Sequence, residues 1–377
     1  MLEKGYSYLF KNASKLGHWR EPRSTALAVM CLAMRNDGES RWLLELGNWI
    51  RSNQTKKGSM KGSWGDEVWD TAMCVMALRD LRVPAEDRSI RTAMSWMQDI
   101  FSCNGKNNWH YEPWETSWAL MAIFRCDTYP ELVNIPEAIK WLSALQSDEG
   151  EDKGKIVSPH YTAYFILLHD FFSDTRHSHE KIDPKEFHEL KDLLSGTSKK
   201  CSQYLLSQLE LAADDKLWTG EAWSNGQILW ALSRANEFPF DNSRLVKKIV
   251  NWFKTTQKKK GNWSDVEDTA SAILGLCEFA RGIIRAEVKA AGAKERIISQ
   301  LETDLKKAVP LPKLWIKKPI YEFDQDTGFV SLNARKKYIL WITGSVAAVA
   351  AIITFIQNMQ WIYNKLDQLR DIVGRIW

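Results

Sequence analysis

The stretch from Gly261 to Leu276 reads Gly-Asn-Trp-Ser-Asp-Val-Glu-Asp-Thr-Ala-Ser-Ala-Ile-Leu-Gly-Leu, and its pattern recurs along the chain. A Gly-x-Trp turn leads into acidic residues and then into a small, apolar helical sequence. The position of Thr269 is matched in the related units by Thr25, Thr71, Thr116, Thr162 and Asn225. The steps along this series are 46, 45, 46, 63 and 44 residues. A near-constant period that is interrupted once indicates a repeat fold.

Composition sets broad limits on the class of protein. The chain has 377 residues, of which 45% are hydrophobic, so there is room for two ordinary domains or one large one. The net charge of +4 gives no reason to expect a nucleic-acid partner. The six cysteines include no Cys-x-x-Cys pair, and several lie in apolar runs, which is typical of buried thiols in a reducing compartment.

Each repeat has the plan of a helical hairpin. An amphipathic first helix is followed by a polar turn and then by a second helix that is apolar around most of its circumference, which predicts burial on all sides. The second helices are expected at residues 21–34, 67–81, 112–124, 159–171, 221–235 and 265–280. Six buried helices alternating with six half-exposed ones predict an all-α fold, an α6/α6 toroid over residues 1–282. The first and last repeats are as apolar as the middle ones, which favours a closed ring over an open solenoid.

The 63-residue step contains an insertion at about residues 173–200, which is polar and contains His177, His179 and His188. A His-Ser-His pattern occurs in metal sites. The simpler interpretation is a solvated loop with a short helix, and no metal site is predicted.

The region after the toroid divides into four parts. Residues 283–308 predict an amphipathic helix, and the proline-containing residues 309–337 predict a linker. Residues 338–357 predict a transmembrane helix, because 338–356 carry no charge and approach the roughly 20 apolar residues that a span needs. Residues 358–377 predict a second amphipathic helix with a short heptad-like seam. Small residues at four-residue spacing within the span favour self-association, so a homo-oligomer is expected.

Basic residues flank the predicted span on both sides, so their number hardly distinguishes the two orientations. The first residues contain no apolar signal core, and the cysteines favour a reducing compartment. We therefore expect a single-pass membrane protein with its toroid in the cytoplasm.

The turns resemble a known repeat. Trp252-Phe253-x3-Gln257-x3-Gly261-x-Trp263 is similar to the QW repeat of squalene–hopene cyclases and related terpenoid cyclases, and weaker copies begin near Tyr8, Trp49, Trp96, Trp141 and Tyr204. The resemblance covers about residues 1–282, and the β subunits of protein prenyltransferases share the toroid it implies. We interpret the repeated residues as structural: the tryptophan stacks over the start of the second helix, and the glutamine side chain bonds the turn backbone.

One motif resembles a catalytic one. Asp265-Val266-Glu267-Asp268-Thr269-Ala270 is similar to the Asp-x-Asp-Asp-Thr-Ala motif of class II cyclases, in which the middle aspartate protonates an alkene or epoxide. The resemblance implies that Glu267 is the acid and that Asp265 and Asp268 orient it. The departure from Asp to Glu adds a methylene and displaces the carboxyl group.

Aligned columns separate structural acids from functional ones. The column four places before each Thr predicts helix N-caps, and its members are Glu21, Glu67, Glu112, Ser158, Glu221 and Asp265. The column directly before Thr contains Asp70, Glu115 and Asp268 at the third helical position, where an acid completes a capping box. The column between them contains Arg23, Trp69, Trp114, His160, Trp223 and Glu267. Capping does not explain Glu267, which makes it the leading functional candidate.

The other members of that column suggest a ligand-binding surface. If Trp69, Trp114, His160 and Trp223 face the lumen, their rings stabilise a cation, as a carbocation cyclase requires. Aromatic residues in the core of a toroid give the same pattern, so both interpretations stay open.

Two functions are compatible with these features. The first is a membrane-anchored, class II terpenoid-cyclase-like enzyme that cyclises an isoprenoid or other lipid after protonation by Glu267. Class II cyclases place the cavity between two toroids, so a second copy or a toroid-containing partner would supply the other wall. The alternative is a non-catalytic toroid that binds a lipid or protein partner and signals through an oligomeric transmembrane helix, for example as a bacterial stress or defence effector. No cofactor is expected, because the chain contains no Asp-x-Cys zinc motif and no Gly-rich phosphate loop.

Overall fold

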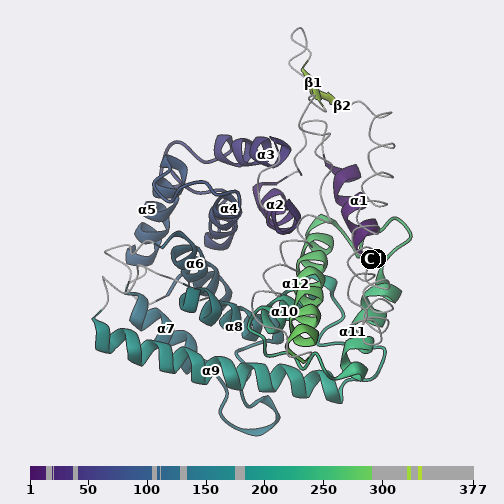
Figure 1. The fold of residues 1–377 in the computed structure, drawn as a ribbon. Coiled ribbons are helices and arrows are strands. Elements are labelled where there is room, and N and C mark those ends of the chain that lie inside the picture. Colours follow the sequence, from purple (N-terminus) through teal and green to yellow (C-terminus); the bar gives the residue numbers. More distant parts are fainter. Residues whose placement is uncertain are drawn as a thin grey trace.

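The computed structural model describes residues 1–13, 19, 21–36, 41–103, 108–110, 112–127, 134–174, 183–290, 321–323 and 330–332. In this part of the chain the fold is helical (Figure 1), which confirms the all-α class. The α-helices are α1 (Leu2–Asn12), α2 (Pro22–Asn36), α3 (Arg41–Ser52), α4 (Val68–Asp80), α5 (Arg88–Cys103), α6 (Pro113–Cys126), α7 (Ile135–Ala144), α8 (Pro159–Asp174), α9 (Pro184–Leu211), α10 (Ala222–Arg234), α11 (Ser243–Thr256) and α12 (Val266–Ala290). A 3-10 turn, η1 (Gly150–Asp152), precedes α8.

The even-numbered helices form a closed ring at the centre of the molecule. Each of α2, α4, α6, α8 and α10 packs against the next even-numbered helix, and α12 packs against α2. The odd-numbered helices lie outside this ring (Figure 1), and α3, α5, α7 and α9 each pack against an inner helix. The inner helices are buried on every side, as in α4, where all residues from Thr71 to Leu78 are buried. Their all-round apolar sequence is explained by this position.

Glutamine side chains at Gln54, Gln146 and Gln257 link their turns to the following outer helix. Gln54 Nε2 donates to the carbonyl of Gly62 in its own turn, at 2.8 Å, and to that of Ser89 at the start of α5, at 2.7 Å. Gln257 Nε2 makes the same pair of bonds, to Gly261 at 2.8 Å and to Met1 at 3.0 Å. Because Met1 precedes α1, the link that joins neighbouring repeats elsewhere joins the last repeat to the first here.

The turn tryptophans and the aligned threonines form a second repeated contact. Trp64 N donates to Thr71 Oγ1 at 3.0 Å, and its indole Nε1 donates to the carbonyl of Ile50 in the preceding outer helix at 2.6 Å. Equivalent pairs of bonds occur at Trp19, Trp109 and Trp263. The Thr column therefore fastens the turn to the inner helix, while the indole fastens it to the outer helix.

Helices α10 and α12 approach each other more closely than a side chain allows. A Cβ atom added at Gly226 would lie 2.5 Å from the carbonyl of Ser271, and one added at Gly275 would lie 2.3 Å from the carbonyl of Gly226. Glycine at both positions permits this backbone contact.

The predicted polar insertion differs from the expected loop and short helix. Residues 184–200 are the N-terminal half of α9, a single helix of 28 residues. Asp183 caps this helix by accepting hydrogen bonds from the main-chain N–H groups of Lys185 and Glu186, and the buried Leu190 and Leu194 face inward. His188 is exposed, and its Nε2 lies 3.7 Å from Asp192, whereas His177 and His179 lie outside the described residues.

The region after residue 282 is described only in part. Helix α12 continues without a break to Ala290, so the start of the predicted helix at 283–308 belongs to α12. Within the predicted linker at 309–337, β1 (Tyr321–Phe323) and β2 (Val330–Leu332) pair antiparallel. The predicted transmembrane helix at 338–357 and the helix at 358–377 lie outside the described residues. Among the helices that the structure does describe, none has the length and apolar character to cross a membrane.

Candidate functional site

The first turns of the inner helices meet at one end of the ring. Each of these helices begins directly after the predicted cap, so the column from Arg23 to Glu267 occupies the second helical position. Five members of the column, together with Asp70, lie in one connected group. We call this group the aromatic end of the ring; it consists of Arg23, Trp69, Asp70, Trp114, Trp223 and Glu267.

Glu267 is held by two hydrogen-bond donors from α2. Ser24 Oγ donates to Glu267 Oε1 at 2.6 Å, and Arg23 Nε donates to the same oxygen at 3.1 Å. The Glu267 side chain is 22% exposed and the Arg23 side chain 25%. These bonds tie the Glu267 carboxyl group to α2, and they occupy the oxygen Oε1.

The two aspartates of the motif bind main-chain groups. Asp265 Oδ1 accepts a hydrogen bond from Asp268 N at 2.9 Å, so it caps α12 as predicted. Asp268 Oδ1 accepts from Trp223 N at 2.8 Å and thereby binds the neighbouring helix α10. Burial raises the pKa of Asp268, while the bond from Trp223 lowers it. Neither of these bonds involves Glu267, so the expected orienting role has no support from them.

The predicted cap positions are correct for Glu67 and Glu112, but the predicted bonds are wrong. Neither side chain caps the backbone of its helix. Glu112 Oε2 accepts from the indole Nε1 of Trp114 at 3.1 Å, and Glu67 accepts in the same way from Trp69. The extra methylene of glutamate carries the carboxylate past the helix N–H groups to the indole two residues later.

The two acids that were predicted to complete capping boxes in α6 and α4 contact basic side chains. Glu115 is 3% exposed and pairs with His110 Nδ1 at 2.6 Å. Asp70 Oδ1 accepts from Arg23 Nη1 at 3.3 Å, so Arg23 bridges α12 and α4. The pKa of Asp70 is raised to about 7 in all: burial raises it most, the Arg23 guanidinium lowers it, and the nearby carboxylates of Glu67 and Glu267 raise it.

Three tryptophans of the column make contact, whereas His160 lies apart. The Trp69 ring meets the Trp114 ring at 4.7 Å and 85°, and it meets the Trp223 ring at 6.2 Å and 88°. The Cζ atom of Arg23 lies 4.5 Å from the centre of the Trp69 ring, a cation–π geometry. His160 contacts Tyr161 at 4.3 Å, and burial lowers the pKa of its imidazole while Glu221 raises it.

Side chains also meet across the ring. Helix α4 lies opposite α10 in the order of the inner helices, so the contact of Trp69 with Trp223 crosses the ring. Deeper inside, the fully buried Trp118 of α6 lies 6.5 Å from Trp230 of α10 and 5.6 Å from Tyr164 of α8. At these two levels the interior of the ring is occupied by aromatic side chains.

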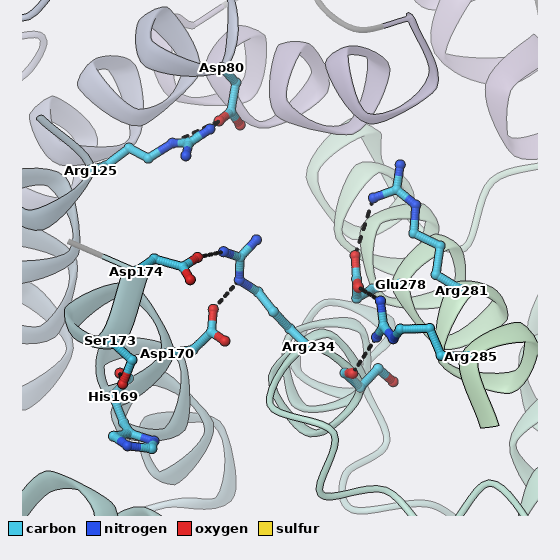
Figure 2. A network of polar contacts seen from close by, with 11 residues as sticks. Asp80, Arg125, His169, Asp170, Ser173, Asp174, Arg234, Glu278, Arg281 and Arg285 are labelled. Atoms are coloured by element: carbon cyan, nitrogen blue, oxygen red, sulfur yellow. Dashed lines mark hydrogen bonds and ion pairs between the residues drawn. The ribbon is translucent and has the colours of Figure 1, made fainter. Parts of the chain in front are cut away.

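Sequence reasoning missed a charged network at the opposite end of the ring (Figure 2). Arg125 Nη2 lies 2.7 Å from Asp80 Oδ1, and Arg234 pairs with both Asp170 and Asp174. Glu278 accepts from Arg285 at 3.1 Å and from Arg281 at 3.3 Å. We call this group the arginine end; it consists of Arg79, Asp80, Arg125, Asp170, Asp174, Arg234, Glu278, Arg281 and Arg285.

The arginines also satisfy the last carbonyls of the inner helices. Arg281 Nη2 donates to Met34 O and Arg285 Nη2 to Ser233 O, each at 2.9 Å. Cations at helix C-termini interact favourably with the helix dipole. Burial raises the pKa values of Asp80 and Asp170, and the neighbouring arginines lower them.

The sequence does contain a signal for the arginine end, in the aligned column nine residues after the Thr column. The residues there are Met34, Asp80, Arg125, Phe171, Arg234 and Glu278. Two acids and two arginines in one column of otherwise apolar helices indicate ion pairs between neighbours. An alignment of the helix ends, in addition to the helix starts, would have revealed them.

Comparison with known proteins adds no family. No protein-family model matches the chain, and no curated protein matches it. Among the described residues, no group of three or more His, Cys, Asp and Glu side chains is arranged to hold a metal ion. The resemblance to terpenoid cyclases therefore depends on the sequence motifs.

Proposed function

We propose that the chain is a non-catalytic binding protein built on an α6/α6 toroid of the terpenoid-cyclase type. Residues 338–357 anchor it in a membrane, and a partner bound at the toroid is signalled through an oligomer of this membrane helix. The observation that carries the proposal is the position of Glu267, one oxygen of which is occupied by hydrogen bonds from Arg23 and Ser24 of the neighbouring helix.

The contacts across the ring support the same proposal. A cyclase needs an empty, water-excluding space in which a long hydrocarbon can fold before it is protonated. The indoles of Trp69 and Trp223, and those of Trp118 and Trp230, meet inside this ring, so at these two levels the ring itself leaves no such space. A cyclase cavity would then depend entirely on a second toroid.

The membrane anchor and the oligomer are supported by sequence alone. The uncharged run at 338–356 and the small residues within it favour a membrane helix that associates with copies of itself. A bound partner can act on such an oligomer only if it binds one arrangement of the subunits better than another.

The catalytic part of the proposal is tested by product analysis. Membranes containing the full chain are incubated with squalene or with geranylgeranyl diphosphate, and the extracted lipids are analysed by mass spectrometry. We expect no cyclic product from the wild type or from Glu267→Gln. A cyclic product that the wild type forms and Glu267→Gln does not form would overturn the proposal.

The anchoring part is tested by fractionation and crosslinking. The full chain is expected to stay with membranes through an alkaline carbonate wash and to yield crosslinked oligomers. A chain ending at residue 337 is expected to lose both properties. Release of the full chain by carbonate, or oligomers that persist without residues 338–377, would contradict this part.

A second candidate, a protonation-initiated cyclase, is favoured by one observation at Asp70. The pKa of this carboxyl group is raised to about 7, mainly by burial, which favours its protonated form near neutral pH, as a general acid requires. In the same product assay this enzyme would lose activity in Asp70→Asn and keep it in Glu267→Gln. That pattern would identify Asp70 as the proton donor.

A further inference from the structure

We propose that the aromatic end of the ring is a docking surface for an arginine-bearing peptide segment of a partner protein. The inference deepens the proposed binding role and rests on it, since it names the chemistry of the partner. The tryptophans supply flat faces for guanidinium groups, and the surrounding carboxylates supply hydrogen-bond acceptors.

The first observation is a cluster of partly exposed indoles. Trp69, Trp114 and Trp223 come from three different helices and meet nearly at right angles, and none of them is fully buried. Clustered tryptophans that keep some exposure are typical of binding surfaces, where they contribute most of the affinity. Their perpendicular arrangement presents ring faces, which are the parts that attract cations.

The second observation is an excess of negative charge around these rings. From each cap position to the aligned Thr or Asn, the six inner helices carry one arginine, Arg23, and nine carboxylates. The carboxylates are Glu21, Glu67, Asp70, Glu112, Glu115, Glu221, Asp265, Glu267 and Asp268. The helix N-termini offset this charge by about half an elementary charge each, so the end stays negative.

The carboxylates are close enough to affect one another. Glu67 raises the pKa values of Asp70 and Glu115, and Glu221 raises that of Asp268. A bound cation relieves this mutual repulsion, which gives the surface an electrostatic preference for basic partners.

The third observation is that the chain already holds one guanidinium group here. Arg23 lies 4.5 Å from the centre of the Trp69 ring, with Glu267 at 3.1 Å and Asp70 at 3.3 Å. A planar cation over an indole with carboxylates at its edge is the arrangement that distinguishes arginine from lysine. Trp114 and the exposed Glu112 place the same two groups next to each other on the following helix, which suits an arginine from a partner.

A quaternary ammonium group, as in a choline headgroup, is the other cation that aromatic surfaces recognise. It has no N–H donors and therefore leaves the carboxylates without hydrogen bonds. The number of acceptors at this end favours the guanidinium group, and the experiment separates the two ligands.

The test measures binding of labelled peptides to the full chain in detergent by fluorescence anisotropy. The probes are twelve-residue peptides in which glycine alternates with arginine, lysine or glutamate. We expect the arginine peptide to bind, the lysine peptide to bind about threefold or more weakly, and the glutamate peptide not to bind. Equal affinity for arginine and lysine peptides, or displacement of the arginine peptide by choline and not by free arginine, would overturn the inference.

Variants locate the surface. Glu112→Gln and Trp114→Ala should each weaken the arginine peptide about threefold to fivefold. Glu189→Gln removes one exposed carboxylate from α9, away from the aromatic end, and should leave binding unchanged. Thermal midpoints show whether each variant is folded. If Trp114→Ala does not fold, Glu112→Gln alone tests the surface. If Glu112→Gln binds the arginine peptide as tightly as the wild type, or if Glu189→Gln loses as much affinity as Glu112→Gln, the peptide does not bind at the aromatic end.

The outcome is separable from the proposed function. Failure of the peptides to bind, with no cyclic product formed, removes only the arginine-bearing partner. A cyclic product that depends on Glu267 or Asp70 removes the non-catalytic role whatever the peptides do.

Discussion

At the arginine end of the ring, carboxylates are paired with arginines, whereas the helix starts at the aromatic end contain more carboxylates than arginines. Asp80, Asp170, Asp174 and Glu278 each contact an arginine. At the aromatic end, the stretches from each cap position to the aligned Thr or Asn contain nine carboxylates and one arginine, Arg23, beside partly exposed indoles. Both ends follow the helix dipole, with acids at the N-termini and arginines at the C-termini. The difference in pairing distinguishes an end that holds the ring together from an end with capacity for a ligand.

The largest loss of stability is expected at the close contact between α10 and α12, helices that run from one end of the ring to the other. Gly226→Ala places a methyl group 2.5 Å from the main chain of Ser271 and forces α10 away from α12. We expect a loss of about 3 kcal/mol or more in the free energy of unfolding, measured by thermal denaturation of the full chain. In α9, Gly196 has no atom within 4 Å of its added Cβ, so Gly196→Ala should stabilise by about 0.5–1 kcal/mol. Equal effects would refute the close helix contact.

Substitution at the arginine end should be the next most costly. Arg234→Ala removes the partner of Asp170, which is 20% exposed, and the cation 4.6 Å from the Phe171 ring. After allowance for solvent screening we expect a loss of about 2–3 kcal/mol. Arg244 and Asp214 form a highly exposed pair, with side chains 75% and 83% exposed, and Arg244→Ala should cost no more than about 0.5 kcal/mol. The thermal midpoints of Arg234→Ala and Arg244→Ala, measured side by side, show whether the ion pairs at the arginine end stabilise the fold.

The stability of the fold should depend on pH through Asp70 at the aromatic end. The pKa of Asp70 is about 7 in the folded chain and ordinarily 3.8, so the folded state binds this proton more tightly. The associated stability is present at low pH and is lost as the pH rises through about 7. Between pH 5 and pH 8 the wild type should therefore lose about 2 kcal/mol more than Asp70→Asn, measured by urea denaturation.

Comparison with Asp70→Asn cancels the contributions of the remaining titratable groups, including His160. The same slope in both proteins would show that Asp70 is not the group responsible. A slope of the opposite sign would mean that Arg23 outweighs burial and keeps Asp70 ionised.

Arg23→Ala should destabilise the fold less than Arg234→Ala. Arg23 has three carboxylate partners, Glu21, Asp70 and Glu267, but it is 25% exposed, and water can reach the carboxylates it leaves, so we expect a loss of about 1 kcal/mol. The variant also makes the aromatic end more negative, so it should bind the arginine peptide about threefold more tightly. If Arg23→Ala is as destabilising as Arg234→Ala and binds the peptide no better, the distinction between the two ends is wrong.

The helix pattern could be predicted from the sequence because burial on all sides leaves a clear signal. The recurring Thr residues and the apolar runs after them located every inner helix. The sequence predicts only a loop with a short helix for the N-terminal half of α9, because much of its surface faces water. The buried Leu190 and Leu194 are a weak signal among charges. Periodicity identifies helices by what they bury, so a mostly exposed helix is difficult to find in this way.

The alignment grouped several of the residues that meet at the aromatic end, but it did not predict their bonds. Alignment placed Trp69, Trp114, Trp223 and Glu267 in one column, and all four side chains lie at one end of the ring. Arg23 stood in the same column, but its ion pair with Glu267 spans 244 residues and requires the ring to close. Local rules for helix caps assigned Glu67 and Glu112 to backbone groups, because such rules do not include the competing indole N–H.

The link from Gln257 to Met1 has a consequence for biosynthesis. At about 5–20 residues per second, the ribosome needs roughly 12–50 s to make the 256 residues that separate these partners. Throughout that interval the flank of α2 that will meet α12 has no neighbour, and its apolar side chains are open to other chains. Nascent molecules on one messenger are therefore exposed to mispairing until the final repeat emerges, and chaperone demand should peak late in translation.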